Sequence, residues 1–277
     1  MERLWLITNH GSGSADAEKA AAIETVCVER GLRFVGRTVF PAEPLPSSEA
    51  LDAAGVDTVV LFAGDGTINA AACSLDGWKG QALVLPGGTM NMLARDLHGD
   101  SDAEAIIHAA HRAPWATSLR FVEAGPHRAF VAMIAGPATT WAHAREMVRE
   151  GKIGRLWRAV RFAWRRSWAG EVTVFDGRRR RARCNAVIVT AAADGALDVS
   201  AITAERWSDI ARLGWEWLKG DWHAAANVDD SRACEAALAG RRAIHALFDG
   251  EEAKLPSPVL VRAGLSELKF LRTVEGE

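Results

Sequence analysis

Three short apolar runs in the first hundred residues each lead into a glycine-rich turn and then into helical sequence. Residues 4–8 precede a Gly-Ser-Gly turn, residues 58–62 a Gly-Asp-Gly-Thr turn, and residues 82–85 a Gly-Gly-Thr turn. Strand, turn and helix repeated in this order predict a parallel sheet with flanking helices, which is an α/β fold. Ligands of such sheets bind at the carboxyl ends of the strands, so we expect all three turns at one ligand-binding edge.

The pattern changes after about residue 118. From there, strand-like runs follow one another without regular helices, at residues 121–122, 130–134, 172–175, 185–189, 197–202, 242–248 and 259–262. We therefore predict an α/β domain over residues 1–118 and a mainly antiparallel β domain over residues 119–277, whose extreme C-terminus can return to the first domain. Two helices are expected to interrupt the β domain, at residues 140–168 and 208–219.

The positive charge of the chain is concentrated in one segment. The formal net charge is −2, yet residues 149–183 hold twelve Lys or Arg against three acidic residues, a local charge of +9. Within this segment, Lys152–Trp168 has helical periodicity, with one apolar, Trp-rich face and one basic face. Such a helix fits an anionic membrane interface, and it fits equally well an ordinary amphipathic helix packed on the β domain. Residues 178–181, four arginines at an expected hairpin tip, add positive charge in either case.

Composition and spacing exclude several classes of protein. The four cysteines are widely spaced, which predicts neither a zinc site nor a disulfide framework and favours a reducing compartment. No run approaches the ~20 apolar residues that span a bilayer. We therefore expect a cytoplasmic protein whose membrane contact, if any, is peripheral at the inner face. Nucleic acid binding lacks an accompanying fold signature and is not expected.

The turn at residues 63–69 has the chemistry of a phosphate-binding loop. Gly64 and Gly66 permit positive φ and close backbone approach, and the helix that follows presents unpaired N–H groups to an anion. A tight turn with Asp65 or Thr67 as a helix cap is the simpler alternative. A second turn of the same kind at residues 86–95 favours phosphate binding, because neighbouring strand ends can grip one nucleotide from both sides. No G-x-x-x-x-G-K-[ST] motif is present, so a P-loop enzyme is excluded.

At this point the sequence resembles the catalytic domain of the diacylglycerol kinases, lipid kinases related in fold to NAD kinase. Residues 63–69 are similar to the family's GGDGTxN motif and residues 86–95 to PxGTxNDxAR. The turn at residues 9–13, the D-G-x-L-D-V stretch at residues 194–199 and the D-G-E triplet at residues 249–251 match further motifs. These segments occur in family order and span nearly the whole chain.

The resemblance implies an ATP-dependent kinase that phosphorylates a lipid hydroxyl at the membrane surface, with ATP and Mg²⁺ as cofactors. By position, it implies a nucleotide site made of Asn9, Gly13, Thr38, Gly64, Asp65, Gly66, Thr67, Asn69, Thr89 and Asn91. It implies that Asp194 binds Mg²⁺ together with the backbone carbonyls of Ala191 and Ala196. The proton acceptor is expected in the D-G-E triplet, with Glu251 as the first choice and Asp249 as the second. An Asp-Gly hairpin turn without catalytic function is the alternative for this triplet.

Several positions depart from the family pattern. Ala63 replaces a glycine, His10 a proline, Gly87 an aliphatic residue and Met92 an acidic residue, and the family's middle G-x-G-x-D-A segment has no clear counterpart. Two other functions therefore stay open: a soluble-substrate kinase similar to NAD kinase, and a catalytically silent protein that binds lipid or nucleotide. The acceptor lipid and the oligomeric state are not predicted.

Overall fold

The computed structural model describes residues 1–9, 17–88, 91–112, 115–136, 172–177, 179–203 and 228–274. These residues form two compact units, one of Met1–Leu119 with Leu265–Glu277 and the other of Arg120–Gly264. Two strands, β5 (Trp115–Ala124) and β16 (Val259–Arg272), have residues in both units. The predicted helices at residues 140–168 and 208–219 and the basic segment Lys152–Trp168 lie outside the described residues.

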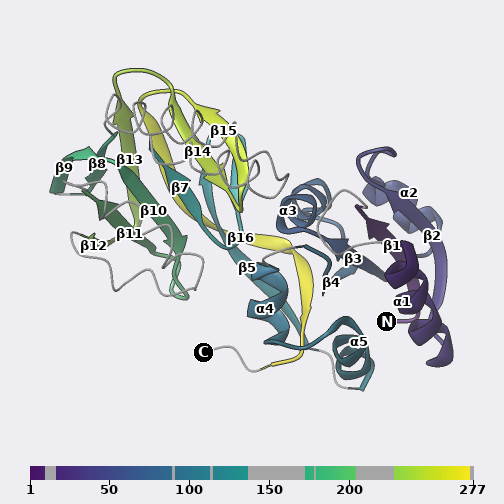
Figure 1. Ribbon diagram of the computed structural model, residues 1–277. Helices are drawn as coiled ribbons and strands as arrows, with labels where there is room; N and C mark the ends of the chain where they lie inside the picture. The colour runs from purple at the N-terminus through teal and green to yellow at the C-terminus, as the bar shows by residue number, and fades with distance from the viewer. Residues whose placement is uncertain are drawn as a thin grey trace, which may run out of the picture. The chain divides into compact units, whose positions relative to one another are not determined.

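The first unit is an α/β domain, as predicted (Figure 1). Its strands run in the order β2-β1-β3-β4-β16, and each neighbouring pair is parallel. All six residues of β3 are buried, which is typical of a strand covered on both faces of a parallel sheet. The elements are β1 (Arg3–Thr8), α1 (Ala17–Glu29), β2 (Arg33–Val39), α2 (Ser48–Ala53), β3 (Thr58–Ala63), α3 (Asp65–Ser74), β4 (Gln81–Pro86), α4 (Met92–His98) and α5 (Ala103–Arg112).

Side-chain alternation along the strands builds the core of this unit. Val60 and Phe62 of β3 point to one face, where they pack with Ile23 of α1 and with Ile106 and Ile107 of α5. The sheet and its helices thus form one packed body. The strand ends that carry the glycine turns are therefore fixed by the core rather than by the turns themselves.

The end of the chain completes the sheet of the first unit. In β16, Lys269 pairs with Gln81 and Phe270 with Ala82, so the strand lies parallel to β4. Leu268, Phe270 and Leu271 are at most 1% exposed. This part of β16 covers the edge of β4 that would otherwise end the sheet.

The second unit is built from antiparallel strands. One sheet has the order β12-β11-β10-β7-β14-β15, and β13, β8 and β9 continue from β16 in the other sheet. Buried side chains from both sheets form one core, which includes Val174, Val187, Leu238 and Phe248. The fold class is confirmed. The elements are β6 (His127–Ala129), β7 (Met133–Ala135), β8 (Val172–Asp176), β9 (Arg179–Cys184), β10 (Ala186–Ala191), β11 (Leu197–Ile202), β12 (Val228–Ala233), β13 (Glu235–Gly240), β14 (Ile244–Phe248) and β15 (Glu251–Leu255).

Two predictions for single segments were wrong. The run at residues 130–134 is a strand only from Met133 onward, because the backbone N–H groups of residues 130–132 bond to a side chain instead. In the first unit, the helix that we expected to follow the turn at residues 63–69 starts inside that turn, at Asp65. Among described residues, no helix has both the length and the apolar content needed to cross a membrane.

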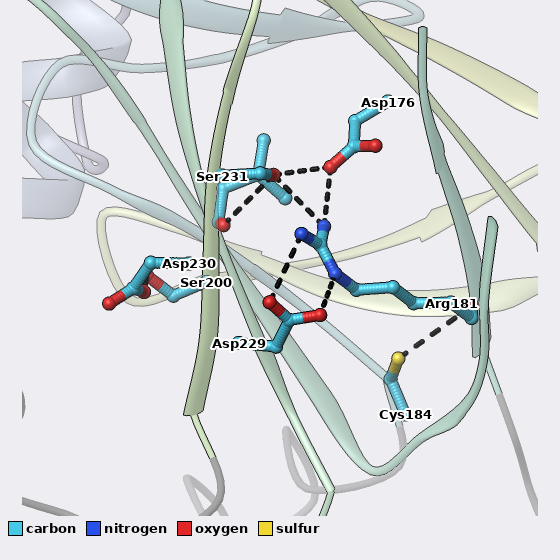
Figure 2. A network of polar contacts seen from close by, with 8 residues as sticks. Asp176, Arg181, Cys184, Ser200, Asp229, Asp230 and Ser231 are labelled. Carbon is cyan, nitrogen blue, oxygen red and sulfur yellow. Dashed lines mark hydrogen bonds and ion pairs between the residues drawn. The ribbon is translucent and has the colours of Figure 1, made fainter. Parts of the chain in front are cut away.

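A network of ion pairs ties β8 and β9 to β12 (Figure 2). The guanidinium of Arg181 pairs with the carboxylates of Asp176 and Asp229 and donates to Ser231 Oγ at 2.9 Å. The Arg181 side chain is 9% exposed and that of Asp176 is 2% exposed. Arg181 is therefore an internal counter-ion, and it does not add to the surface charge that we predicted for residues 178–181.

Candidate active site

The two glycine turns of the first unit interlock through their backbones. A Cβ atom built on Gly87 would lie 2.6 Å from the backbone nitrogen of Ala63, and one built on Gly88 would lie 2.7 Å from Cα of Gly64. Real Cβ atoms do not approach other atoms this closely. The turn after β4 can therefore rest on the turn after β3 only because both of its residues lack side chains.

Close packing, and not an unusual backbone conformation, explains these glycines. Gly64 is the N-cap of α3 with φ −79° and ψ 164°, an extended conformation open to any residue. Gly64 therefore does not use the positive φ that a glycine permits. The left-handed residue is Asn91, with φ 50°, which precedes α4. Its side-chain Oδ1 accepts a hydrogen bond from the backbone N–H of Gly88 at 2.6 Å and so closes the second turn.

Asp65 connects the two turns through its carboxylate. Its Oδ1 accepts a hydrogen bond from the backbone N–H of Leu93, in the first turn of α4, at 3.3 Å. Burial raises the pKa of Asp65 above its ordinary value, and the N–H groups of Leu93, Met92 and Asn91 oppose that shift. Asp65 thus serves as a helix cap, but for α4 and not for the helix on which it stands.

The strand end of β1 joins the same cluster. Asn9 donates a hydrogen bond from Nδ2 to the Oγ1 atom of Thr67 at 2.9 Å. Thr67 and Gly66 belong to the first turn of α3, and Asn69 lies in its second turn. The structure therefore brings together the predicted residues Asn9, Gly64, Asp65, Gly66, Thr67, Asn69 and Asn91 at the carboxyl edge of the sheet.

Of the other three predicted nucleotide contacts, the structure describes Thr38 alone. Thr38 lies near the end of β2, but it is 4% exposed and its Oγ1 accepts a hydrogen bond from Trp5 Nε1 at 3.0 Å. The hydroxyl oxygen of Thr38 is thus buried and already accepts a hydrogen bond inside the domain. Gly13 and Thr89 lie outside the described residues.

In the second unit, Asp249 organises a backbone loop. Its carboxylate accepts three hydrogen bonds, from the N–H groups of Phe130, Val131 and Ala132, at 2.7–3.1 Å. Asp249 has φ 50° and Gly250 φ 93°, which is the two-residue hairpin turn that the alternative interpretation predicted. Asp249 thus has two structural contributions: it forms the hairpin turn, and it binds the backbone of residues 130–132.

Glu251 has different surroundings from Asp249. It is the first residue of β15, directly after the hairpin turn, and it is exposed. An exposed carboxylate at a fixed strand end can accept a proton from a bound hydroxyl, because its oxygens remain open to a substrate. Of the two carboxylates in the triplet, Glu251 therefore has the better geometry for a general base.

The Asp194 loop contains the predicted metal ligands, but a guanidinium is already bound there. Asp194 Oδ1 accepts hydrogen bonds from Arg232 Nη2 at 2.6 Å and from the Ala196 N–H at 3.1 Å. The Ala196 N–H and the Arg232 guanidinium hold the pKa of Asp194 below its ordinary value. The carbonyl of Ala196 accepts the N–H of Ala192 at 2.8 Å, and Ala191 pairs with Leu197 in the sheet. The part of the chain that the structure describes has no group of three or more His, Cys, Asp or Glu that could hold a metal. The oxygen atoms that Asp194, Ala191 and Ala196 offer therefore fit Mg²⁺ poorly.

A depression of about 480 Å³ lies at the opposite end of the first unit's strands. Its lining includes Asp57, which precedes β3, and Gln81, which begins β4. None of the predicted nucleotide-binding residues lines it. Because ligands of parallel sheets bind at the carboxyl edge, we assign no function to this depression.

Comparison with known proteins finds a family match for the first part of the chain. Residues 3–118 match the diacylglycerol kinase catalytic domain. The match confirms the resemblance for the motifs at residues 9–13, 63–69 and 86–95, and it covers both interlocked turns. The diacylglycerol kinase match ends before Asp194, Asp249 and Glu251. No curated protein sequence matches the chain.

The fold of the whole chain is shared with solved structures of diacylglycerol kinases from Bacillus anthracis strain Sterne, two of the three only provisionally named so. The first has a TM-score of 0.68 and 16% sequence identity and covers 99% of both chains. The second has a TM-score of 0.67 and 17% identity, and it covers 98% of this chain and 97% of its own. The third has a TM-score of 0.66 and 17% identity, with 99% of both chains covered. At 16–17% identity, these comparisons show that the fold is shared.

Sequence reasoning missed two contacts of these regions. It treated Gly87 as a departure from a family pattern, whereas the structure shows that a side chain at Gly87 would collide with Ala63. It also did not connect Arg232 with Asp194, 38 residues earlier. The two adjacent glycines, Gly87 and Gly88, are a sequence signal for the first contact. The sequence holds no such signal for the contact between Arg232 and Asp194, because β12 was not predicted as a strand.

Proposed function

We propose that the chain is an ATP-dependent lipid kinase that transfers the γ-phosphate to a lipid hydroxyl, such as that of diacylglycerol. The observation that carries the proposal is the interlocked pair of turns at the carboxyl edge of the parallel sheet. Gly87 and Gly88 rest on Ala63 and Gly64, and Asp65 ties the second turn to the first. This edge lies within the segment that matches a kinase catalytic domain.

The first turn of α3 is the proposed contact for the nucleotide phosphates. Its N-cap is Gly64, which supplies no side-chain cap, so the first N–H groups of the helix remain suited to an anion. Asn9 fixes Thr67 beside them. The proposed nucleotide-binding residues are those of the sequence analysis: Asn9, Gly13, Thr38, Gly64, Asp65, Gly66, Thr67, Asn69, Thr89 and Asn91. Thr38 is the weakest member of that set, because its hydroxyl is buried against Trp5.

Glu251 is the proposed general base of the transfer. It accepts the proton of the lipid hydroxyl while the hydroxyl oxygen forms a bond to the γ-phosphorus, and the bond from that phosphorus to ADP breaks. Mg²⁺ bound to the nucleotide neutralises charge on the phosphates during such a transfer. Asp249 supports this step only indirectly, by holding the hairpin that presents Glu251. Membrane contact through Lys152–Trp168 stays a prediction.

One assay tests the proposal against both alternatives. ATP turnover is measured with diacylglycerol in mixed micelles, with NAD, and with neither acceptor, and the lipid product is identified by mass spectrometry. We expect turnover and a phosphorylated lipid in the micelle arm alone. Turnover with NAD would instead support a soluble-substrate kinase, and ATP binding without turnover in any arm would support a silent binding protein. A panel of lipids with free hydroxyls then identifies the acceptor.

A further inference from the structure

Arg232 occupies the centre of an ionic cluster at the Asp194 loop. It lies on β12 directly opposite Asp198 of β11 in the antiparallel register. Its Nη2 donates to Asp194 Oδ1 at 2.6 Å, and its Nε lies 3.7 Å from Asp198 Oδ1. One guanidinium therefore connects the tip of the β10–β11 loop to the strand that follows it.

The backbone of this loop is held closed by its own hydrogen bonds. The N–H of Ala192 donates to the Ala196 carbonyl at 2.8 Å, and the N–H of Gly195 donates to the Ala192 carbonyl at 3.0 Å. Gly195 has φ 89°, which only glycine adopts readily. The loop thus has a fixed shape in which Asp194 faces Arg232.

A second cation lies beside the same loop. A Cβ atom built on Gly195 would lie 3.2 Å from Nη1 of Arg120, a residue of β5. Two guanidinium groups therefore border a loop that offers a metal only one carboxylate. Mg²⁺ prefers oxygen ligands and retained water, and a neighbouring positive charge opposes its binding.

We propose that Arg232 is the built-in cation of the Asp194 loop and takes the place of a bound metal ion there. The loop then keeps its shape without free Mg²⁺. This inference does not depend on the acceptor or on the kinase activity, because it concerns the folded chain without nucleotide.

Thermal unfolding of the full chain without nucleotide tests the proposal, first in EDTA and then in MgCl₂ up to roughly 10 mM. The variants are Arg232→Gln, Asp194→Asn and the double variant. Arg262→Gln is the matched control, because Arg262 forms an ion pair of similar exposure with Glu235 at 3.5 Å, in the same unit. Circular dichroism at room temperature verifies that each variant is folded.

The wild-type melting temperature should not depend on Mg²⁺. Arg232→Gln should lower it more than Arg262→Gln does, and Mg²⁺ should restore part of the loss in Arg232→Gln but not in the double variant. Asp194→Asn should melt lower than the wild type with or without Mg²⁺. The proposal is overturned if Mg²⁺ stabilises the wild type and Asp194→Asn abolishes that effect. It is equally overturned if Arg232→Gln behaves like Arg262→Gln, or if Arg232→Gln gains no response to Mg²⁺.

Discussion

Asp249 and Glu251 are separated by one glycine, and their side chains have different surroundings. Asp249 accepts hydrogen bonds from three consecutive backbone N–H groups. Glu251 is exposed at the start of β15. At the scale of single residues, hydrogen-bond partners thus separate a structural carboxylate from a candidate catalytic one.

This difference predicts opposite effects of two conservative substitutions. Glu251→Gln should leave the melting temperature and ATP affinity nearly unchanged and lower turnover by about 10²–10⁴-fold, the usual contribution of a general base. Asp249→Asn should cost roughly 1–3 kcal/mol of stability, because an amide has one acceptor oxygen for three N–H groups. Turnover, nucleotide affinity and urea unfolding of both variants are the measurements. Normal turnover in Glu251→Gln would place the base elsewhere, with Asp65 as the next candidate.

A second prediction at this scale concerns the pH dependence of stability. His98 is fully buried and burial lowers its pKa to about 4, from an ordinary value of 6.5. The folded state therefore holds the neutral ring, and its contribution to stability is present above pH 6.5 and lost as the pH falls toward 4. Between pH 7 and pH 5 the loss should be about 2 kcal/mol.

Urea unfolding at these two pH values measures the effect. His98→Gln should lower stability at pH 7 and show a smaller difference between pH 7 and pH 5 than the wild type does. An equal pH dependence in both proteins would show that His98 is not the titrating group.

At the scale of elements, the glycine turns are parts of the core as much as binding loops. The turn after β4 touches the turn after β3 through backbone atoms, and Asp65 of α3 caps α4. When a ligand binds one of the two turns, the other turn is therefore already held in place beside it. Such preorganisation lowers the entropy cost of binding.

Gly87→Ala should therefore destabilise the fold, by roughly 1–3 kcal/mol, because the new methyl group meets the backbone of Phe62 and Ala63. Nucleotide affinity should fall with it, since the two turns must separate. Gly125→Asn is the control, because nothing lies within 4 Å of a Cβ there and asparagine tolerates its φ of 60°. Thermal unfolding and ATP titration check both variants. A fully stable Gly87→Ala protein would contradict the packing argument.

At the scale of the whole molecule, the two ends of the chain belong to the same unit. β16 begins in the second unit and ends beside β4, so its residues 265–272 extend the sheet that contains β1. The sheet of the first unit therefore lacks this strand until residues 265–272 have been synthesised. Removal of the C-terminal segment would expose one edge of the sheet and part of its core.

Phe270→Ala measures this dependence. The side chain is fully buried, and a Phe-to-Ala change in a core costs about 3–5 kcal/mol. Leu265→Ala on the same strand is the control, because Leu265 is 53% exposed and should cost little. Urea unfolding gives both values. Equal stability of the two variants would show that the end of the chain contributes little to the first unit.

The amino-acid sequence by itself determined the fold class and the diacylglycerol kinase resemblance. Both depend on local patterns: apolar runs of strand length, glycine turns and motif residues that are close in sequence. The strand Leu197–Ile202 was predicted with its observed bounds, because its apolar residues and flanking turn are local signals. The polar strand β12 had no such signal, since its sequence is Val-Asp-Asp-Ser-Arg-Ala.

Only the tertiary structure decided which side chains far apart in sequence contact one another. Asp249 meets residues 130–132, Arg232 meets Asp194, and Gly87 meets Ala63, across separations that no periodicity encodes. Hydrogen bonds, ion pairs and close packing depend on distances of a few ångströms in the folded chain. A sequence motif names the residues that are able to act, and the contacts of each side chain determine which of them remain available to a ligand.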